Sequence, residues 1–175
     1  VAADSALIVV SARSGIEMET ERVWQYAEEA ALPRAFFINK MDRERADFDR
    51  VVEELRIRFG TGVVPVQIPI GKEAAFQGVV DLLALHMKIM THDDEALTTE
   101  IPEYIEVEVE EARQKLIEAI AEFNNELLEK YIEGTEITEL EAAAALIEGI
   151  QACKIFPVFC GSAKANIGIR KLMKG

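Results

Sequence analysis

Three polar residues of this 175-residue sequence, Asn39, Lys40 and Asp42, form an NKxD pattern directly after a short apolar run. An aspartate carboxylate can accept two parallel hydrogen bonds, from the ring N1–H and the exocyclic amino group of guanine, whereas adenine presents neither donor in that arrangement. Asn39 can bridge neighbouring loops and reach the O6/N7 edge, and the methylene stem of Lys40 can lie along the ring face. The pattern predicts a guanine-binding loop, against the alternative of a polar turn that caps the next helix.

A second loop with the same potential is Gly161 followed by Ser162, Ala163 and Lys164, again directly after an apolar run. Small residues let backbone N–H groups approach a ring oxygen closely. By itself this sequence is typical of a tight turn. Together with the NKxD pattern it predicts the donor to guanine O6. No metal ligand is predicted, because Cys153 and Cys160 lack CxxC spacing and have no histidine beside them. No catalytic residue is predicted either.

The elements that would position these loops alternate between strand and helix. We expect a strand over residues 5–10, a helix from an N-cap at Thr20 to residue 31, a strand over 35–38, and a helix from Asp47 to about residue 59. A third buried strand is expected over 155–160. This alternation is typical of an α/β protein with a parallel sheet, in which ligands bind beyond the carboxyl ends of the strands.

The alternation stops between residues 60 and 152. Pro65 and Pro69 predict an edge or irregular strand over 63–70, and further strands are expected over 78–83 and 87–90. Apolar residues at steps of three and four predict one amphipathic helix over 107–131.

Two local signals predict the end of that helix and the start of another. Gly134 suits the C-terminal cap of the first, and Thr138 with Glu141 forms a capping box that opens the second, which runs through Ile150.

The composition is half hydrophobic and 29% charged, with a net charge of −13. The segment 100–148 holds fifteen glutamates and three basic residues, so it carries nearly all of that charge. Such an acidic body argues against autonomous binding of nucleic acid, and no apolar run is long enough to cross a membrane. The acidic helix face is either a solvated surface or a surface that binds a partner.

With these residues in view, the sequence resembles translational GTPases, and within them elongation factor G. The likeness covers essentially the whole chain and is carried by six segments, residues 4–12, 20–24, 39–43, 64–71, 78–81 and 157–163. One departure is that the family commonly reads Ser-Ala-Leu-Lys in the last loop, whereas Lys164 directly follows Ala163 here. The smaller GTPases share this shorter form, so the departure bears on which paralogue this is.

The resemblance implies a partial P-loop-GTPase-type parallel sheet with an inserted α+β subdomain, called G′ in the family. It divides the chain into residues 1–59, a partial GTP-binding domain with the NKxD loop, residues 60–152, the G′ insertion, and residues 153–175, the return to the GTP-binding domain with the SAK loop.

The resemblance also implies a function. It points to a ribosomal translocase-type GTPase of protein synthesis in the cytoplasm, with GTP or GDP bound and Mg²⁺ in the parent protein. The ribosome is the implied partner, and the C-terminal domain of its stalk protein would face the G′ helices, with four glutamates as candidate contacts, Glu110, Glu111, Glu118 and Glu122. A ribosome-recycling or ribosome-protection paralogue, and an isolated acidic interaction module, stay open as alternatives.

Two features lead us to expect a piece of a longer protein that cannot itself hydrolyse GTP. The chain opens without methionine and runs at once into a strand-like segment, and no GxxxxGK[ST] pattern occurs in it. That pattern supplies the backbone, lysine and hydroxyl groups that hold phosphates and magnesium.

Overall fold

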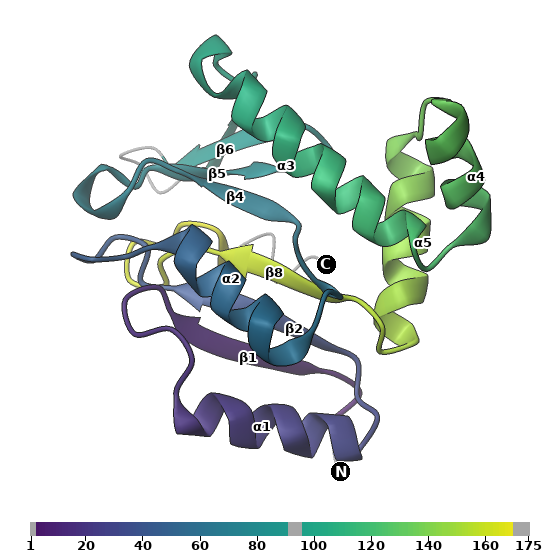
Figure 1. Cartoon of the computed structure of the whole chain (residues 1–175). Helices are drawn as coiled ribbons and strands as arrows, with labels where there is room; N and C mark the ends of the chain where they lie inside the picture. Colours follow the sequence, from purple (N-terminus) through teal and green to yellow (C-terminus); the bar gives the residue numbers. More distant parts are fainter. Residues whose placement is uncertain (1–2, 91–95, 170–175) are drawn as a thin grey trace.

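A computed structural model describes residues 3–90 and 96–169 and contains two four-stranded sheets (Figure 1). In the first sheet every neighbouring pair is parallel, and the strands lie in the order β1 (Ala6–Ser11), β2 (Arg34–Asn39), β8 (Phe156–Cys160) and β3 (Val63–Pro65). The non-sequential order, with β8 between β2 and β3, confirms the predicted α/β class. It also brings the two candidate loops next to each other.

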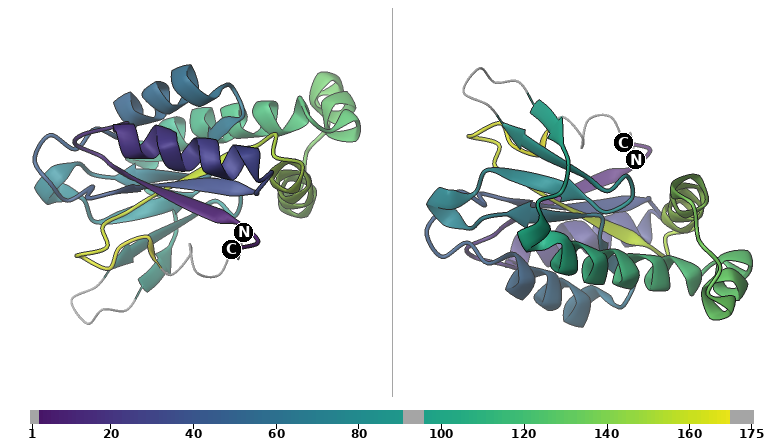
Figure 2. Two further views of the ribbon diagram at one scale, coloured as in Figure 1. Left: turned by 90° about the horizontal axis from the view of Figure 1, so that it is seen from below. Right: turned by 90° about the horizontal axis from the view of Figure 1, so that it is seen from above.

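Two helices, α1 (Met18–Glu29) and α2 (Phe48–Phe59), lie on the same side of the parallel sheet (Figure 2). Trp24 of α1 is buried there and stacks on Phe36 of β2 and Phe59 of α2, with ring centroids 5.4 and 4.4 Å apart. On β1, side chains alternate: Ile8 faces this core, whereas Val9 is 56% exposed. The opposite face of β1 is therefore open.

Both boundaries of α1 differ from the prediction, whereas the N-cap of α2 agrees with it. The N-cap of α1 is Glu17, and Thr20 is the buried third residue, whose Oγ1 accepts a hydrogen bond from the Glu17 amide at 3.2 Å. Thr20 was the wrong cap because it closes a capping box from inside the helix, and the helix ends at Glu29 rather than residue 31. Asp47 caps α2 as predicted, and its Oδ1 accepts from the Arg50 amide at 3.0 Å.

The second sheet is antiparallel, in the order β4 (Gln67–Ile70), β5 (Gly78–Asp81), β6 (His86–Met90) and β7 (Ala96–Thr99), with a short 3₁₀ turn, η1 (Glu73–Ala75), between β4 and β5. The sequence did not predict β7. The predicted strand over 63–70 is two strands that belong to different sheets. Between them, the Val66 amide donates to Val158 O and its carbonyl accepts from Leu82 N, both at 3.1 Å. This one residue therefore joins the two sheets.

Three helices follow, α3 (Glu103–Ala121), α4 (Asn125–Glu133) and α5 (Glu139–Gln151). The single helix predicted over 107–131 is wrong. The chain leaves the helical conformation at Asn124, whose Oδ1 accepts from the Leu127 amide at 3.1 Å and starts α4. The apolar periodicity runs across the break because Leu116 and Leu127 both stay buried. Asparagine competes for backbone hydrogen bonds in a way that periodicity does not register.

The remaining helix signals are confirmed. Gly134 ends α4 in the left-handed conformation, and Thr138 with Glu141 forms a complete capping box at the start of α5. One contiguous hydrophobic core includes residues of both sheets. No helix within the described ranges is long and apolar enough to cross a membrane.

Candidate functional site

The two candidate loops meet at the carboxyl end of the parallel sheet. Asn39 is the last residue of β2, and Ser162 lies two residues beyond the end of β8. The two strands are parallel neighbours, with Ile38 opposite Cys160. Since parallel strands end at the same edge, the NKxD and SAK residues are brought together as the sequence predicted.

Asn39 ties these loops together. Its Oδ1 accepts hydrogen bonds from two backbone amides, that of Lys40 at 2.7 Å and that of Ala163 at 3.0 Å. The backbones are also joined directly, because Gly161 N donates to Ile38 O at 3.0 Å and Met41 N donates to Gly161 O at 3.2 Å. The asparagine side chain is thus used to fix the two loops relative to each other.

Asp42 has one carboxylate oxygen without a hydrogen-bond partner among the described residues. Its side chain is 24% exposed, and its Oδ2 lies 3.8 Å from Arg43 Nε. Its Oδ1 is buried and accepts no hydrogen bond from the described part of the chain. Because an unpaired buried carboxylate oxygen is costly, a ligand donor at this atom would relieve the cost. The position suits an N–H of a bound base.

The three SAK residues differ in burial: Ser162 is inside the loop and supports it, whereas Ala163 and Lys164 are exposed. Ser162 is fully buried, its Oγ accepts from the Ala165 amide at 3.1 Å, and its backbone pairs in both directions with Ile167 at 3.0 Å. Ala163 and Lys164 are exposed. Since the Ala163 amide is bonded to Asn39, the amide of Lys164 is the one among residues 161–165 with no partner in the described part of the chain. Lys40, also exposed, adopts a left-handed conformation with φ of 65°.

Gly161 is required by close packing at this edge. A Cβ placed on it would lie 2.2 Å from Ile167 O and 3.0 Å from the Phe37 ring. The glycine therefore lets the backbone of the second loop approach its neighbours closely.

Sequence reasoning missed a supporting group on α2. The Arg50 guanidinium donates to the carbonyls of Ala12 and Arg13, at 3.3 and 2.9 Å, and is paired with Glu54. The Ala12 amide in turn donates to Asn39 O at 2.9 Å. The i,i+4 spacing of Arg50 and Glu54 is visible in the sequence as a helix-surface pair, but the loop that it holds is brought there by the fold.

The predicted partner-binding glutamates are elsewhere. All four are exposed, lie on α3 or at its C-terminal cap, and do not belong to the NKxD and SAK loops: Glu110, Glu111, Glu118 and Glu122. Within residues 3–90 and 96–169, no three His, Cys, Asp or Glu side chains are grouped so as to hold a metal ion.

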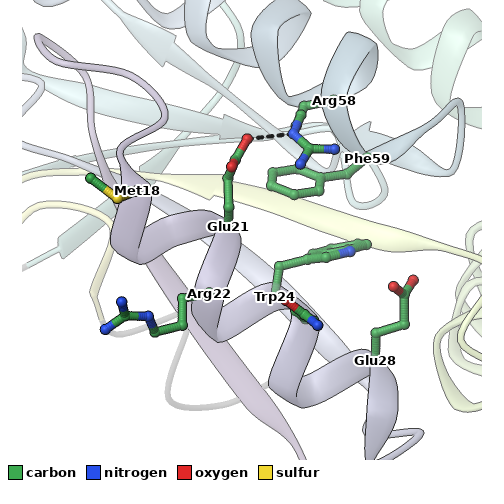
Figure 3. A pocket seen from close by; sticks show the side chains of 8 residues that line it. Met18, Glu21, Arg22, Trp24, Glu28, Arg58 and Phe59 are labelled. Carbon is green, nitrogen blue, oxygen red and sulfur yellow. Dashed lines mark hydrogen bonds and ion pairs between the residues drawn. The ribbon is translucent and has the colours of Figure 1, made fainter.

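A separate hollow of about 500 Å³ lies between α1 and α2 (Figure 3). Its walls include Trp24 and Phe59, and an ion pair between Glu21 and Arg58 crosses it. It contains no residue of the NKxD or SAK loops, so it is not part of the candidate guanine site.

Comparison with known proteins gives two findings. The model of the elongation factor Tu GTP binding domain matches residues 1–175. A crystal structure of a protein from Thermus thermophilus has a TM-score of 0.88 at 32% sequence identity, over 99% of this chain and 26% of that one. The chain thus spans about a quarter of the length of this solved relative.

Proposed function

Since the chain belongs to the translational GTPase family defined by the elongation factor Tu GTP binding domain, we propose that its NKxD and SAK loops bind the base of a guanine nucleotide for a role in protein synthesis. The observation that carries the proposal is the buried Oδ1 of Asp42, which has no hydrogen-bond partner among the described residues and lies beside a loop that Asn39 holds in place. Guanine supplies two N–H donors for one carboxylate, which an adenine base does not.

Each site residue then has a distinct part. Asp42 accepts from guanine N1–H and the 2-amino group, and the amide of Lys164 donates to O6. The stem of Lys40 covers one face of the ring. Asn39 and Ser162 hold the loops through Ala163 N and Ala165 N, at 3.0 and 3.1 Å. Base recognition therefore depends on backbone groups that the loops already hold in place and on one carboxylate.

The phosphates and their magnesium ion do not fit the residues of this chain. The sequence contains no GxxxxGK[ST] pattern, and the described residues form no carboxylate cluster that could hold the ion. We therefore propose that these 175 residues recognise the base and do not hydrolyse GTP by themselves, whereas the family's activity is GTP hydrolysis.

The finer assignment that we propose is an elongation factor G-type translocase working on the ribosome in the cytoplasm. Residues 1–59 and 153–175 would form the guanine-binding part, and residues 60–152 the G′ insertion. Glu111, Glu118 and Glu122, spaced seven and four apart along α3, are exposed on one face, and this face suits a basic patch on the ribosomal stalk protein. Glu110 flanks it.

An Asp42→Asn substitution separates the guanine site from the stalk surface. An asparagine amide can donate to the C2 carbonyl of xanthine, so the preference between GDP and XDP should shift towards XDP by at least about tenfold. An amide NMR titration with GDP, XDP and ADP measures it, with signals of residues 39–42 and 162–164 as reporters. Stalk-domain binding should not change.

The reciprocal variant carries Glu111→Gln and Glu118→Gln. It should weaken binding of the stalk C-terminal domain at low salt and leave the GDP-induced shifts unchanged.

For the Asp42→Asn variant, the matched control is Asp49→Asn, which removes the charge of an exposed aspartate on α2 near the loops. Equal responses to GDP and ADP in the unsubstituted chain would refute the guanine site.

A further inference from the structure

We propose that Glu73 is a positioning residue for guanine recognition. It lies on the η1 turn of the antiparallel unit, by which we mean the sheet β4–β7 together with η1 and α3. Discrimination between bases then depends on the position of that unit. The inference rests on the proposed function of Asp42. Glu73 does not touch the base. It acts on the conformation of the segment 40–46, which presents Asp42.

The segment 40–46 is in a conformation that its own residues do not favour. Lys40 and Arg45 both have positive φ, 65° and 63°, although neither is glycine. Such residues cost free energy and persist where surrounding contacts fix them. Within the segment the backbone forms two tight turns, with Arg43 N donating to Lys40 O and Ala46 N donating to Arg43 O, both at 3.1 Å.

Glu73 supplies one of the fixing contacts from outside. Its Oε1 accepts a hydrogen bond from the Arg45 amide at 2.6 Å, across 28 residues of sequence and from the turn between β4 and β5. A carboxylate acceptor makes a stronger bond than a neutral one. Glu73 itself has a φ of 53°. Two residues before it lies Gly71, at which a Cβ would lie 2.0 Å from Ala75 O. Close packing therefore restricts the conformation of the turn that carries the carboxylate.

Met41 supplies a second link on the other side of Asp42. It is the variable residue of the NKxD pattern and is only 1% exposed. Together with Ile70 of β4 and Tyr104 and Ile105 of α3, it lines a small hollow of about 130 Å³. On one side of Asp42, Met41 packs towards the antiparallel unit. On the other side, Arg45 is hydrogen-bonded to Glu73 of that unit.

This arrangement has a consequence for regulation of the site. A partner that displaced α3 would act on the Met41 side of Asp42, and one that displaced η1 would act on the Arg45 side. Either change would reach the carboxylate that reads the base. The antiparallel unit is then more than a docking surface, since it forms part of the support for guanine discrimination.

The experiment compares GDP with IDP, whose base lacks the 2-amino group and so has one donor fewer for Asp42. Affinities are measured by amide NMR titration of the 175-residue chain and of three variants, Glu73→Ala, Glu73→Asp and Glu73→Gln. The first removes the acceptor, the second withdraws it by one methylene, and the third keeps a neutral acceptor. Glu53→Ala, an exposed glutamate on α2, is the matched control.

We expect Glu73→Ala and Glu73→Asp to lower the GDP-to-IDP affinity ratio by about three- to tenfold, with Glu73→Gln closer to the unsubstituted chain. Loss of the fold would weaken binding of both nucleotides by the same factor. Misplacement of Asp42 would weaken binding of GDP more than that of IDP, because guanine makes two hydrogen bonds to Asp42 and the base of IDP makes one. Trp24 fluorescence during urea unfolding shows which variants are folded, and Glu73→Asp decides the test if Glu73→Ala is not.

Each alternative result has a separate meaning. An unchanged ratio in folded Glu73→Asp overturns the inference and leaves the guanine site standing. An unsubstituted chain that does not distinguish GDP from IDP overturns the proposed function and the inference together. Without nucleotide, the amide signals of residues 39–43 should move in Glu73→Ala and stay in place in Glu53→Ala.

Discussion

Two side-chain oxygens at the candidate site are used in opposite ways. Asn39 Oδ1 accepts two backbone N–H groups, whereas Asp42 Oδ1 is buried and accepts none from the described residues. Residue type and spacing were enough to nominate both. The structure separates the oxygen that holds the loops from the one that is open to a ligand. It also turns the hydroxyl of Ser162 towards its own loop.

A residue-scale prediction concerns Glu141. The Lys130 ammonium, together with the amide and hydroxyl of Thr138, lowers the pKa of this carboxyl from its ordinary 4.5 to about 2. Since the folded pKa lies below the unfolded one, the ionised carboxylate contributes stability that is fully present above about pH 4.5 and is lost as pH falls towards 2. A carboxyl-carbon NMR titration should give the low pKa.

The variant Lys130→Met provides the control for this titration. It removes the largest cause of the shift, so the pKa of Glu141 should rise while the capping box with Thr138 remains. Glu139, exposed on the first turn of the same helix, serves as the reference carboxyl. A Glu141 pKa that does not respond to Lys130→Met would contradict the assigned cause.

At the scale of elements, local signals predicted three helix caps correctly, misplaced both ends of α1 and did not register the break between α3 and α4. The caps at Asp47, Gly134 and Thr138 are confirmed, because each depends on a side chain or a backbone conformation within a few residues. The break between α3 and α4 was missed, because the apolar stripe continues through it. Periodicity reports which side faces the core and does not report whether the helix is continuous.

Asn124→Ala tests the break. Loss of the hydrogen bond from the Leu127 amide to Asn124 Oδ1 should cost about 0.5–2 kcal/mol of stability. Asn125→Ala, at the first helical position and exposed, should change stability much less. Urea unfolding followed by circular dichroism at 222 nm measures both. If Asn124→Ala instead raised the free energy of unfolding, a continuous helix through α3 and α4 would be the more stable conformation.

At the scale of the whole molecule, the two sheets share one hydrophobic core and one backbone joint. Val66 is hydrogen-bonded to Val158 on one side and to Leu82 on the other, and α3 packs on β3 as well as on its neighbours α4 and α5. In Figure 1 the helices α4 and α5 lie at the C-terminal end of α3, away from the NKxD and SAK loops. The exposed glutamates of α3 and the NKxD and SAK loops therefore belong to one body.

Cooperative unfolding is the corresponding prediction. Trp24, the single tryptophan, reports the parallel-sheet side, where it stacks on Phe36 and Phe59, and far-ultraviolet circular dichroism reports all the helices. Because the core is contiguous, the two signals should give the same urea midpoint. Substituting Leu116, which is 1% exposed, by alanine should lower both midpoints together, at a cost of about 2–5 kcal/mol. Two separated transitions would show independent units.

The sequence by itself determined the α/β class, the two loops after buried strands, and the residue types that suit guanine, because strand burial, caps and short motifs are set by neighbours along the chain. Tertiary structure alone decided that 63–70 is shared between two sheets, that Arg50 supports the loop after β1, and that Glu73 reaches Arg45. These contacts join residues that lie far apart in sequence. Their formation depends on which strands pair and how the sheets pack, and no local pattern encodes that choice.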